Sequence, residues 1–277
     1  MDKILTVACS TYGDRISNIL KVYESIDAVK KINFLVIHQV PEGTCLSDES
    51  NSVILRLESH PSIDYIKNSS KGLTLSRNIA IRKTKTQYMW VMDDDLEFIS
   101  GAINKVLKSL EDENINVICH TYESLRPSGL KRVLYPHNRS KVTGKYILRV
   151  ASFEMVLDVN QLKRHNITFR EDMGVGSNII NLGEEAVLIA DILRAGGDVI
   201  HHSVSVNVHP EVSTGMIVNN QNFYSKGVVI KRVFPNFWMA YYFLRDANRI
   251  LRNRTGEFGT ISNRIALIIS LSKGLLH

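Results

Sequence analysis

Apolar and polar residues follow two rhythms along the first hundred positions. Short, continuously apolar runs typical of buried strands are separated by stretches in which apolar residues recur every three or four positions, as in amphipathic helices. The expected strands are residues 4–9, 34–37, 63–66 and 88–92, and the expected helices are 16–26, 53–57 and 76–83, the last with Ser76 as its cap. The strand 88–92 is entirely apolar, as expected at the centre of a parallel sheet covered on both faces. These repeated units predict an α/β doubly wound sheet.

The second half of the chain has a different pattern. Strands are expected at 117–122, 146–159 and 199–208, with a polar, basic loop or hairpin at 126–145. A helix is expected at 184–195, because Gly196 and Gly197 follow it as a stop signal. From Asn236 the pattern is helical to the end, with a break near 255–260. The strand-rich part is therefore followed by a helical tail.

Composition is that of a globular protein with a sizeable core, since 44% of the 277 residues are apolar and 22% are charged. The net charge of +6 permits attraction to anionic lipid surfaces or phosphorylated substrates, but it proves neither. Cys9, Cys45 and Cys119 are scattered, which favours reduced thiols over a disulfide framework. The chain shows no signal-peptide pattern and no apolar run long enough to span a bilayer, so the expected location is the cytoplasm.

Three adjacent carboxylates, Asp93, Asp94 and Asp95, directly follow the apolar strand 88–92. In open parallel sheets the carboxyl ends of the strands are where ligands bind. Carboxylates side by side repel one another, and a divalent cation such as Mg²⁺ or Mn²⁺ would compensate that repulsion. A solvated acidic turn is the alternative, but the position at the end of a buried strand favours a metal site.

Several segments share their order with one enzyme family. They are Cys9–Arg15, Lys71–Ala80, Asp93–Asp95, Ile167–Gly176, Gly183–Glu185 and His209–Gly215. In this order they resemble the family-2 glycosyltransferases of the GT-A fold, in which a Gly-Leu-Ser-x-x-Arg-Asn helix start precedes a strand and an Asp-x-Asp motif. In bacterial polysaccharide, O-antigen and capsule members, a Phe-Gly-x-Gly loop, a Gly-Glu-Asp/Glu motif and a His-Pro segment follow. The resemblance covers residues 4 to about 215.

The resemblance implies a Rossmann-like mixed sheet flanked by helices, with a helical C-terminal extension. We therefore expect a GT-A glycosyltransferase domain at 1–217, with a nucleotide-binding half at 1–100 and an acceptor half at 101–217. A mainly helical extension is expected at 218–277.

The resemblance also implies residues on the nucleotide side. Asp93 would contact the ribose or uracil of the donor, and Asp94 would face away or assist the nucleotide. Arg77 would brace the donor site, and Asn78 would help to hold the loop that carries the aspartates. The first nucleotide-binding loop would supply Ser10, Thr11, Tyr12 and Arg15, although a surface helix arginine is an equal alternative for Arg15.

The metal and the catalytic base fall to other residues. Asp95 and His209 would hold Mn²⁺ or Mg²⁺, with His201 and His202 as competing histidines and Ser213–Gly215 as donors to phosphate. Inverting transfer needs a base for the acceptor hydroxyl. Glu185 is the expected base and Glu184 its orienting neighbour, although an acidic first turn is also a common helix-capping feature.

The C-terminal tail joins the aromatic run 237–244 to Arg245, Arg249, Arg252 and Arg254. Aromatic residues beside a basic helical face suit a peripheral contact with an anionic membrane through 236–254, at the inner face of the cell membrane. A helix packed on the catalytic domain, or a contact between two copies of the chain, would give the same composition.

The sequence thus predicts a metal-dependent, inverting glycosyltransferase. It would move a sugar from a nucleoside diphosphate, UDP being favoured, to a hydroxyl of a saccharide or lipid-linked acceptor in bacterial surface polysaccharide synthesis, without a nucleic-acid partner. A sugar-1-phosphate nucleotidyltransferase would want a Gly-rich phosphate loop, and Ser10–Arg15 offers only Gly13. A non-catalytic nucleotide-sugar-binding domain would lack the Asp run or the Glu pair, and both are present.

Overall fold

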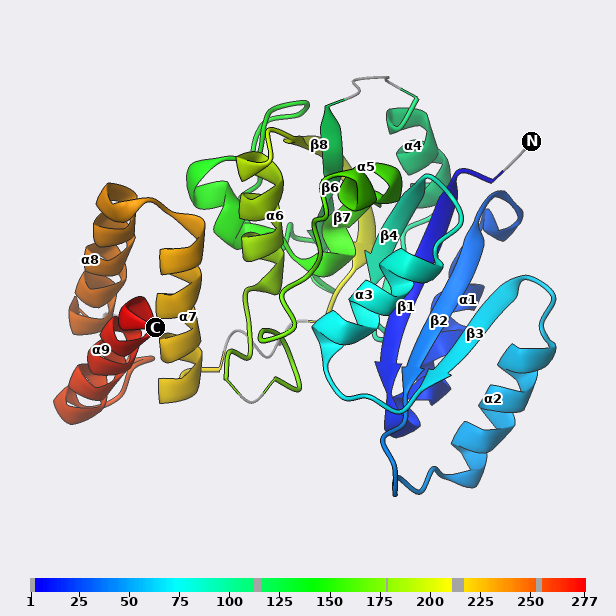
Figure 1. The fold of residues 1–277 in the computed structure, drawn as a ribbon, viewed down its shortest axis with the longest axis horizontal. Coiled ribbons are helices and arrows are strands. Elements are labelled where there is room, and N and C mark those ends of the chain that lie inside the picture. The colour runs from blue at the N-terminus through cyan, green and yellow to red at the C-terminus, as the bar shows by residue number, and fades with distance from the viewer. Residues whose placement is uncertain (1–2, 112–115, 178, 211–216, 253–255) are drawn as a thin grey trace.

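The computed structural model of the chain describes residues 3–111, 116–177, 179–210, 217–252 and 256–277. Its centre is an eight-stranded sheet with the strand order β3-β2-β1-β4-β7-β6-β8-β5 (Figure 1). The strands are β1 (Leu5–Tyr12), β2 (Asn33–Gln39), β3 (Ile63–Asn68), β4 (Tyr88–Met92), β5 (Glu97–Phe98), β6 (Val117–Leu125), β7 (Met155–Asp158) and β8 (Asp198–Val208). The first four run parallel, β7 is antiparallel to β4 and β6, and β8 is parallel to β6 and antiparallel to β5. The predicted mixed sheet is confirmed.

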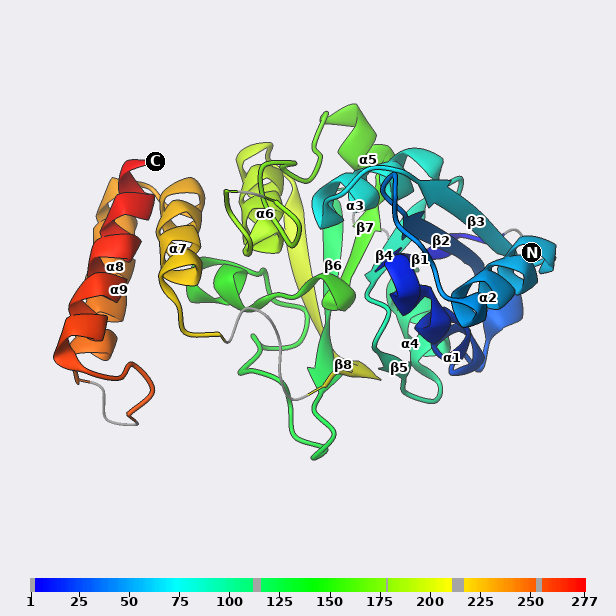
Figure 2. The same ribbon diagram turned by 90° about the horizontal axis from the view of Figure 1, so that it is seen from below.

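Helices cover both faces of this sheet. Those of the first 210 residues are α1 (Ile19–Glu24), α2 (Asp48–Ser59), α3 (Leu73–Lys83), α4 (Ala102–Ser109), α5 (Val159–Arg164) and α6 (Glu184–Arg194). Figure 2 shows α3, α5 and α6 on one side of the sheet and α1 and α4 on the other. Alternate residues of β4 belong to the two resulting cores: Met89 and Val91 pack with residues of α3 and α6, and Trp90 and Met92 with residues of α1 and α4. This two-sided burial is why β4 has no polar residue.

Three expected elements differ in the structure. Ser76 is not the cap of α3, because the helix begins at Leu73 after Gly72 and Ser76 lies buried in its second turn. The segment 146–159 is not one strand: 3-10 turns at Gly144–Arg149 and Ser152–Glu154 precede the short β7, and α5 starts at Val159. The expected helix 16–26 begins as a 3-10 turn at Gly13–Asn18, and only its second part is α-helical.

Three further helices follow the sheet: α7 (Asn220–Val233), α8 (Asn236–Arg252) and α9 (Ile261–Leu276). Figure 2 shows α7 between α6 and the pair α8–α9, at one end of the molecule. Two glycines let α7 and α9 approach closely. A Cβ on Gly227 would lie 2.1 Å from the carbonyl oxygen of Leu271, and one on Gly274 would lie 2.0 Å from that of Tyr224.

The helical C-terminal extension is therefore present, whereas the domain division at residue 217 stays a prediction. Among the described residues, no helix combines the length and apolarity needed to cross a membrane.

Candidate active site

Five carboxylates and two arginines gather at the carboxyl ends of β1 and β4. The loop after β4 carries Asp93–Asp95, and the first turn of α6 carries Glu184 and Glu185. Their cationic partners are Arg15, in the 3-10 turn after β1, and Arg77, in α3. Side chains predicted from segments that are some 170 residues apart in the sequence thus lie in one network.

Asp94 is the buried anchor of the first loop. It accepts hydrogen bonds from the Thr11 hydroxyl at 2.6 Å and from Arg15 Nε at 3.0 Å, and Arg15 Nη2 contacts it as well. Arg15 Nη2 also donates to Asp95 at 3.2 Å, although more than half of the Arg15 side chain is exposed. Asp94 therefore fixes the guanidinium of Arg15 at the open end of β1, where it can meet an anionic ligand.

Of the two other residues predicted for this loop, Ser10 is buried and Tyr12 is exposed. Ser10 is buried and accepts a hydrogen bond from the Ser76 hydroxyl at 3.0 Å, which ties β1 to α3. Tyr12, the last residue of β1, is exposed. Of the two, only Tyr12 has its side chain available to a ligand in this structure.

Arg77 joins the aspartate loop to the glutamate pair. Its side chain is only 2% exposed, and Nη1 donates to Glu184 at 2.9 Å and to Glu185 at 3.4 Å, while Nη2 donates to Asp93 at 3.2 Å. The guanidinium also lies over the ring of Phe169, with its carbon 5.5 Å from the ring centroid. A planar cation with several donors can serve three carboxylates at once, which a lysine ammonium could not do with the same geometry.

A loop from the second half of the sequence closes on this cluster. The amide of Leu73 donates to the carbonyl of Val175, and the Thr74 hydroxyl donates to the carbonyl of Met173, both at 2.9 Å. Gly174 has φ +90°, and a Cβ there would lie 3.3 Å from the Glu184 carboxyl, so a glycine is needed for this approach. The start of α3, the loop 173–176 and Glu184 are thereby held together.

From the resemblance we expect Asn78 to hold the loop of the aspartates, but in the structure its hydrogen bonds go to another segment. Its side-chain amide donates to the carbonyl of Phe169 at 2.9 Å and to Glu171 at 3.0 Å, and it accepts from the Phe169 amide at 2.9 Å. The correction has a simple physical reason: Asn78 lies on the side of α3 that packs against residues 169–171. It positions the Phe169 ring beneath Arg77.

Two of the five carboxyls, Glu185 and Asp93, have raised pKa values. Burial, and then the charge of Glu184, raise the pKa of Glu185 to about 7, although Arg77 and Arg132 act in the opposite direction. Burial also raises the pKa of Asp93, with Asp95 and Glu185 adding to the effect and Arg77 opposing it. A carboxyl with a pKa near neutrality is suited to take up a proton during a reaction.

The carboxylates of this cluster supply some, but not all, of the ligands that a divalent cation needs. Asp95 is 42% exposed and offers hard carboxylate oxygens, and five carboxylates face only two arginines, so the cluster carries excess negative charge. Within the described residues, no three His, Cys, Asp or Glu side chains converge as a ready metal site. A cation held by Asp95 would therefore complete its shell with ligand oxygens and water, as Mg²⁺ commonly does.

His209, expected from the resemblance to bind the metal, directly follows the carboxyl end of β8. The antiparallel pairing of Glu97 with Val208 brings it alongside the residues that precede Glu97. Its Nδ1 lies 2.7 Å from the carbonyl oxygen of Pro210, which can only accept, so Nδ1 carries a hydrogen, and its ring stacks on that of Phe153 with the centroids 4.5 Å apart. Metal-bound histidines are commonly oriented in this way.

The competing histidines have other surroundings. His201 and His202 are buried within the sheet, where they stack on Tyr135 and Tyr122. The segment Ser213–Gly215, predicted to bind phosphate, lies outside the described residues.

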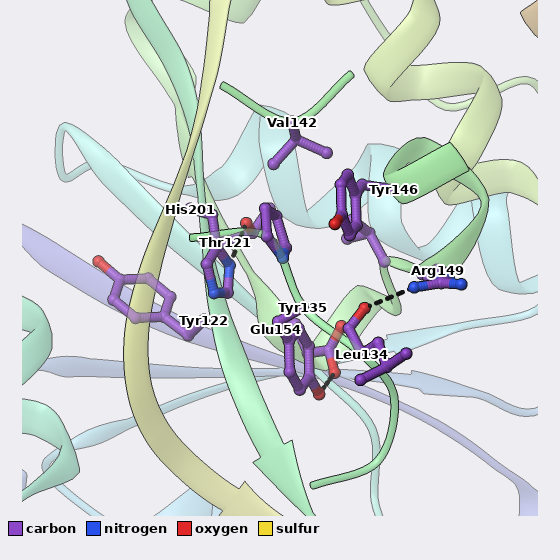
Figure 3. Close-up of a pocket in the computed structure, with 11 residues that line it drawn as sticks. Thr121, Tyr122, Leu134, Tyr135, Val142, Tyr146, Arg149, Glu154 and His201 are labelled. Carbon is purple, nitrogen blue, oxygen red and sulfur yellow. Dashed lines mark hydrogen bonds between the residues drawn. The ribbon is translucent and has the colours of Figure 1, made fainter. Parts of the chain in front are cut away.

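Two features of the site were not predicted from sequence. The Ser152 hydroxyl lies 3.4 Å from Asp93, and Arg132 forms a bidentate pair with buried Glu154 at 2.8 and 2.9 Å. Figure 3 shows Glu154 in a small pocket, with the Tyr135 hydroxyl directed at its carboxylate at 2.5 Å. Arg132 lies in the basic stretch 126–145, and its charge helps to lower the pKa of Glu185. The only sequence signal for it was the basic character of that stretch.

Residues 21–163, just over half of the chain, match the family described as glycosyl transferase family 2. The chain belongs to this family. No curated protein sequence matches it. The segment matched by the family runs from α1 to α5, and thus contains Arg77 and the three aspartates but neither glutamate of α6.

Solved structures show the same fold as this family-2 member. The structure of S. aureus TarS residues 1–349 in complex with UDP-GlcNAc is 12% identical, with a TM-score of 0.66, and the match covers 98% of this chain and 80% of that one. The mannosyltransferase PcManGT from Pyrobaculum calidifontis, in complex with GDP-Man and Mn²⁺, is 15% identical with a TM-score of 0.58, and the match covers 98% and 87%. The predicted GT-A fold is confirmed.

Proposed function

We propose that this chain transfers a sugar from a nucleoside diphosphate sugar, with UDP favoured, to a hydroxyl of a saccharide or lipid-linked acceptor, with inversion at the anomeric carbon. The observation that carries the proposal is the contact of one buried guanidinium, Arg77, with Asp93, Glu184 and Glu185. A donor-side carboxylate and a base of raised pKa are thereby held at one site. The family match favours transfer over sugar-1-phosphate nucleotidyl chemistry.

In the proposed reaction Glu185 accepts the proton of the acceptor hydroxyl. The acceptor oxygen then bonds to the anomeric carbon as the bond from that carbon to the diphosphate breaks, and the nucleoside diphosphate leaves with the bonding electrons. Arg77 holds Glu184 and Glu185 in place, because it is buried and bonded to both. Arg15, oriented by Asp94, faces the diphosphate.

A divalent cation, Mn²⁺ or Mg²⁺, would be held by Asp95 and His209 and would offset the charge of the leaving diphosphate. The Mn²⁺ and GDP-Man in the structure of PcManGT support this assignment. The setting we propose is bacterial surface polysaccharide synthesis, and the cytoplasmic location stays a prediction.

The test is a thermal-shift panel of UDP-, GDP-, CMP- and dTDP-sugars with and without Mn²⁺. A ligand at a hundred times its Kd stabilises a folded protein by about 2.7 kcal/mol, so the correct donor class should raise the melting temperature by several degrees. The Asp95→Asn variant is the matched comparison, in which Mn²⁺ should enhance the shift only at higher concentrations than in the wild type. The proposal fails if no donor binds and if Asp95→Ala leaves sugar transfer unchanged.

A further inference from the structure

Helix α8 has two apolar faces, and only one of them is buried. Tyr242, Ala247 and Ile250 pack towards the other helices. A second row consists of Phe237, Tyr241, Leu244 and Leu251, each between 51% and 77% exposed. The spacings of four, three and seven residues place this row on one side of the helix. A folded monomer rarely exposes such a continuous apolar row without a binding role.

The neighbouring helix α9 repeats this feature. Ile261, Ile265, Ile269 and Leu276 are exposed, again at helical spacing, while Leu267 and Leu271 are buried. Figure 2 shows both helices at the end of the molecule, with α7 between them and the sheet. The two apolar rows therefore lie away from the site that binds the donor.

Positive charge is concentrated in the same part of the chain. Residues 218–277 contain nine Lys and Arg against two acidic residues, a net charge of +7, while the whole chain has +6. Residues 1–217 consequently have a net charge of −1. The excess charge of the protein is thus confined to its three last helices and the turns between them.

The basic side chains of α8 continue into a groove. Arg245 and Arg249 line it from α8, and Lys145 and Arg149 line it from the 3-10 turn at Gly144–Arg149, with Asp246 as the acidic residue among its lining. Arg245 pairs with the partly buried Asp246, and Arg249 pairs with the exposed Glu257. Both arginines are themselves exposed, and ion pairs of exposed cations contribute little and leave the cations available to stronger anions.

We propose that the exposed faces of α8 and α9 dock on an anionic membrane surface. The aromatic and aliphatic row would enter the interface of the bilayer, and the basic groove would receive lipid phosphates. Aromatic and leucine side chains beside arginines are the composition of interfacial helices. A symmetric contact between two copies would instead bring two regions of net charge +7 face to face, which is electrostatically unfavourable.

A short stretch of chain joins the groove to the candidate active site. Its turn ends at Arg149, three residues before Ser152, whose hydroxyl lies 3.4 Å from Asp93. Residues 149–152 are thus the covalent link between the groove and the candidate site. If the proposed function holds, docking would bring the protein to the surface that carries a lipid-linked acceptor, but docking itself does not depend on that function.

The experiment is flotation of the full chain with vesicles of phosphatidylcholine alone, and with vesicles of equal parts phosphatidylcholine and phosphatidylglycerol. We expect binding to the anionic vesicles that weakens with added salt. Two variants separate the contributions: Phe237→Ser with Tyr241→Ser and Leu244→Ser, and Arg245→Gln with Arg252→Gln. The first should lower the partition coefficient at least about tenfold, and the second about fivefold for each arginine removed.

A matched control carries Leu55→Ser and Leu130→Ser, two exposed leucines outside these helices, and should bind as the wild type does. Unchanged circular dichroism and melting temperature show that the variants are folded, since all the replaced side chains are exposed. Equal binding to both kinds of vesicle, or no loss in the triple serine variant, overturns the proposal. So does a wild-type dimer in sedimentation velocity that the triple variant converts to a monomer, because the row is then a contact between copies.

Discussion

Replacing Arg77 by methionine removes the one cation shared by three carboxylates while keeping an unbranched side chain. Its contacts are 2.9 Å to Glu184, 3.2 Å to Asp93 and 3.4 Å to Glu185. Removing one partner of a buried ion pair costs about 3–5 kcal/mol, because the remaining charge is left without compensation. Since two of the three contacts are long, we expect the Arg77→Met variant to lose about 3 kcal/mol of folding free energy at about pH 8.

The loss should depend on pH in a defined direction. Burial already raises the pKa of Glu185 to about 7 and raises that of Asp93, and Arg77 counteracts both effects. Without Arg77 both pKa values rise further, so the folded variant binds protons that the unfolded chain has released. Stability from such a group is present at low pH and is lost as the pH rises through the folded-state pKa, by up to about 1.4 kcal/mol per pH unit for each carboxyl.

The measurement is urea unfolding of the wild type and the Arg77→Met variant at about pH 6 and about pH 8, conditions that bracket the raised pKa of Glu185. The stability difference between the two proteins should be larger at the higher pH. Arg82→Met, an exposed position on the same helix, is the control and should change stability by less than about 0.5 kcal/mol. Equal differences at both pH values, or a variant as stable as the wild type at the higher pH, would refute the charge argument.

Three further predictions concern the base, the metal and the helix contact. Glu185→Gln should lower sugar transfer at least about a hundredfold. The wild-type rate should fall as the pH drops below about 7, because the base becomes protonated. The amount of nucleoside diphosphate formed by the variant and by the wild type, measured at several pH values, tests both expectations. Asp95→Asn should raise, about tenfold or more, the Mn²⁺ concentration at which a donor sugar gives half of its thermal shift. Gly227→Ala should cost about 1–3 kcal/mol in urea unfolding, because its methyl group would meet the Leu271 carbonyl at 2.1 Å.

Each of these has its own contradictory result. Full transfer by Glu185→Gln, or a flat pH profile, would exclude this residue as the base, and Glu58→Gln on an exposed face of α2 is the control with wild-type activity. An unchanged Mn²⁺ requirement would exclude Asp95 as a ligand. A Gly227→Ala variant with wild-type stability would mean that α7 and α9 can separate at little cost.

The parts of the fold that can be predicted from the sequence are those in which neighbouring segments differ clearly in their pattern of apolar and polar residues. β4 was predicted at its observed bounds because both of its faces are buried, which leaves an uninterrupted apolar run. Helix α7 lies within the expected helical extension, but no bounds of its own were predicted, because it begins with Asn220, Gln221 and Asn222 and has Gly227 at its centre. The reason for that glycine is a contact with α9, which no local pattern reveals.

The same distinction applies to the site. The order of motifs brought Asp93, Arg77 and Glu185 into one prediction. That a single guanidinium joins them follows from the approach of Arg77 to the first turn of α6, and the sequence carries no sign of that contact. Asn78 illustrates the limit, since its partners Phe169 and Glu171 lie some ninety residues away and were not the ones expected.

The bond between the start of α3 and the loop 173–176 limits how this enzyme can be recombined with relatives. A chimaera with its crossover near residue 100 would take Arg77 from one parent and Gly174, Glu184 and Glu185 from the other. The charge cluster would then combine side chains from two different proteins. A crossover before Asn220 keeps that cluster intact and instead exposes the contacts of α7 to mismatch: the close approach of Val229 to Gly183, the hydrogen bonds of Asn181 with Asn222 and Ser225, and the partly exposed pair Arg232–Asp172. Apolar contacts, neutral hydrogen bonds and a partly exposed ion pair tolerate mismatch better than buried charges tolerate the loss of a partner, so the second crossover is the one to choose.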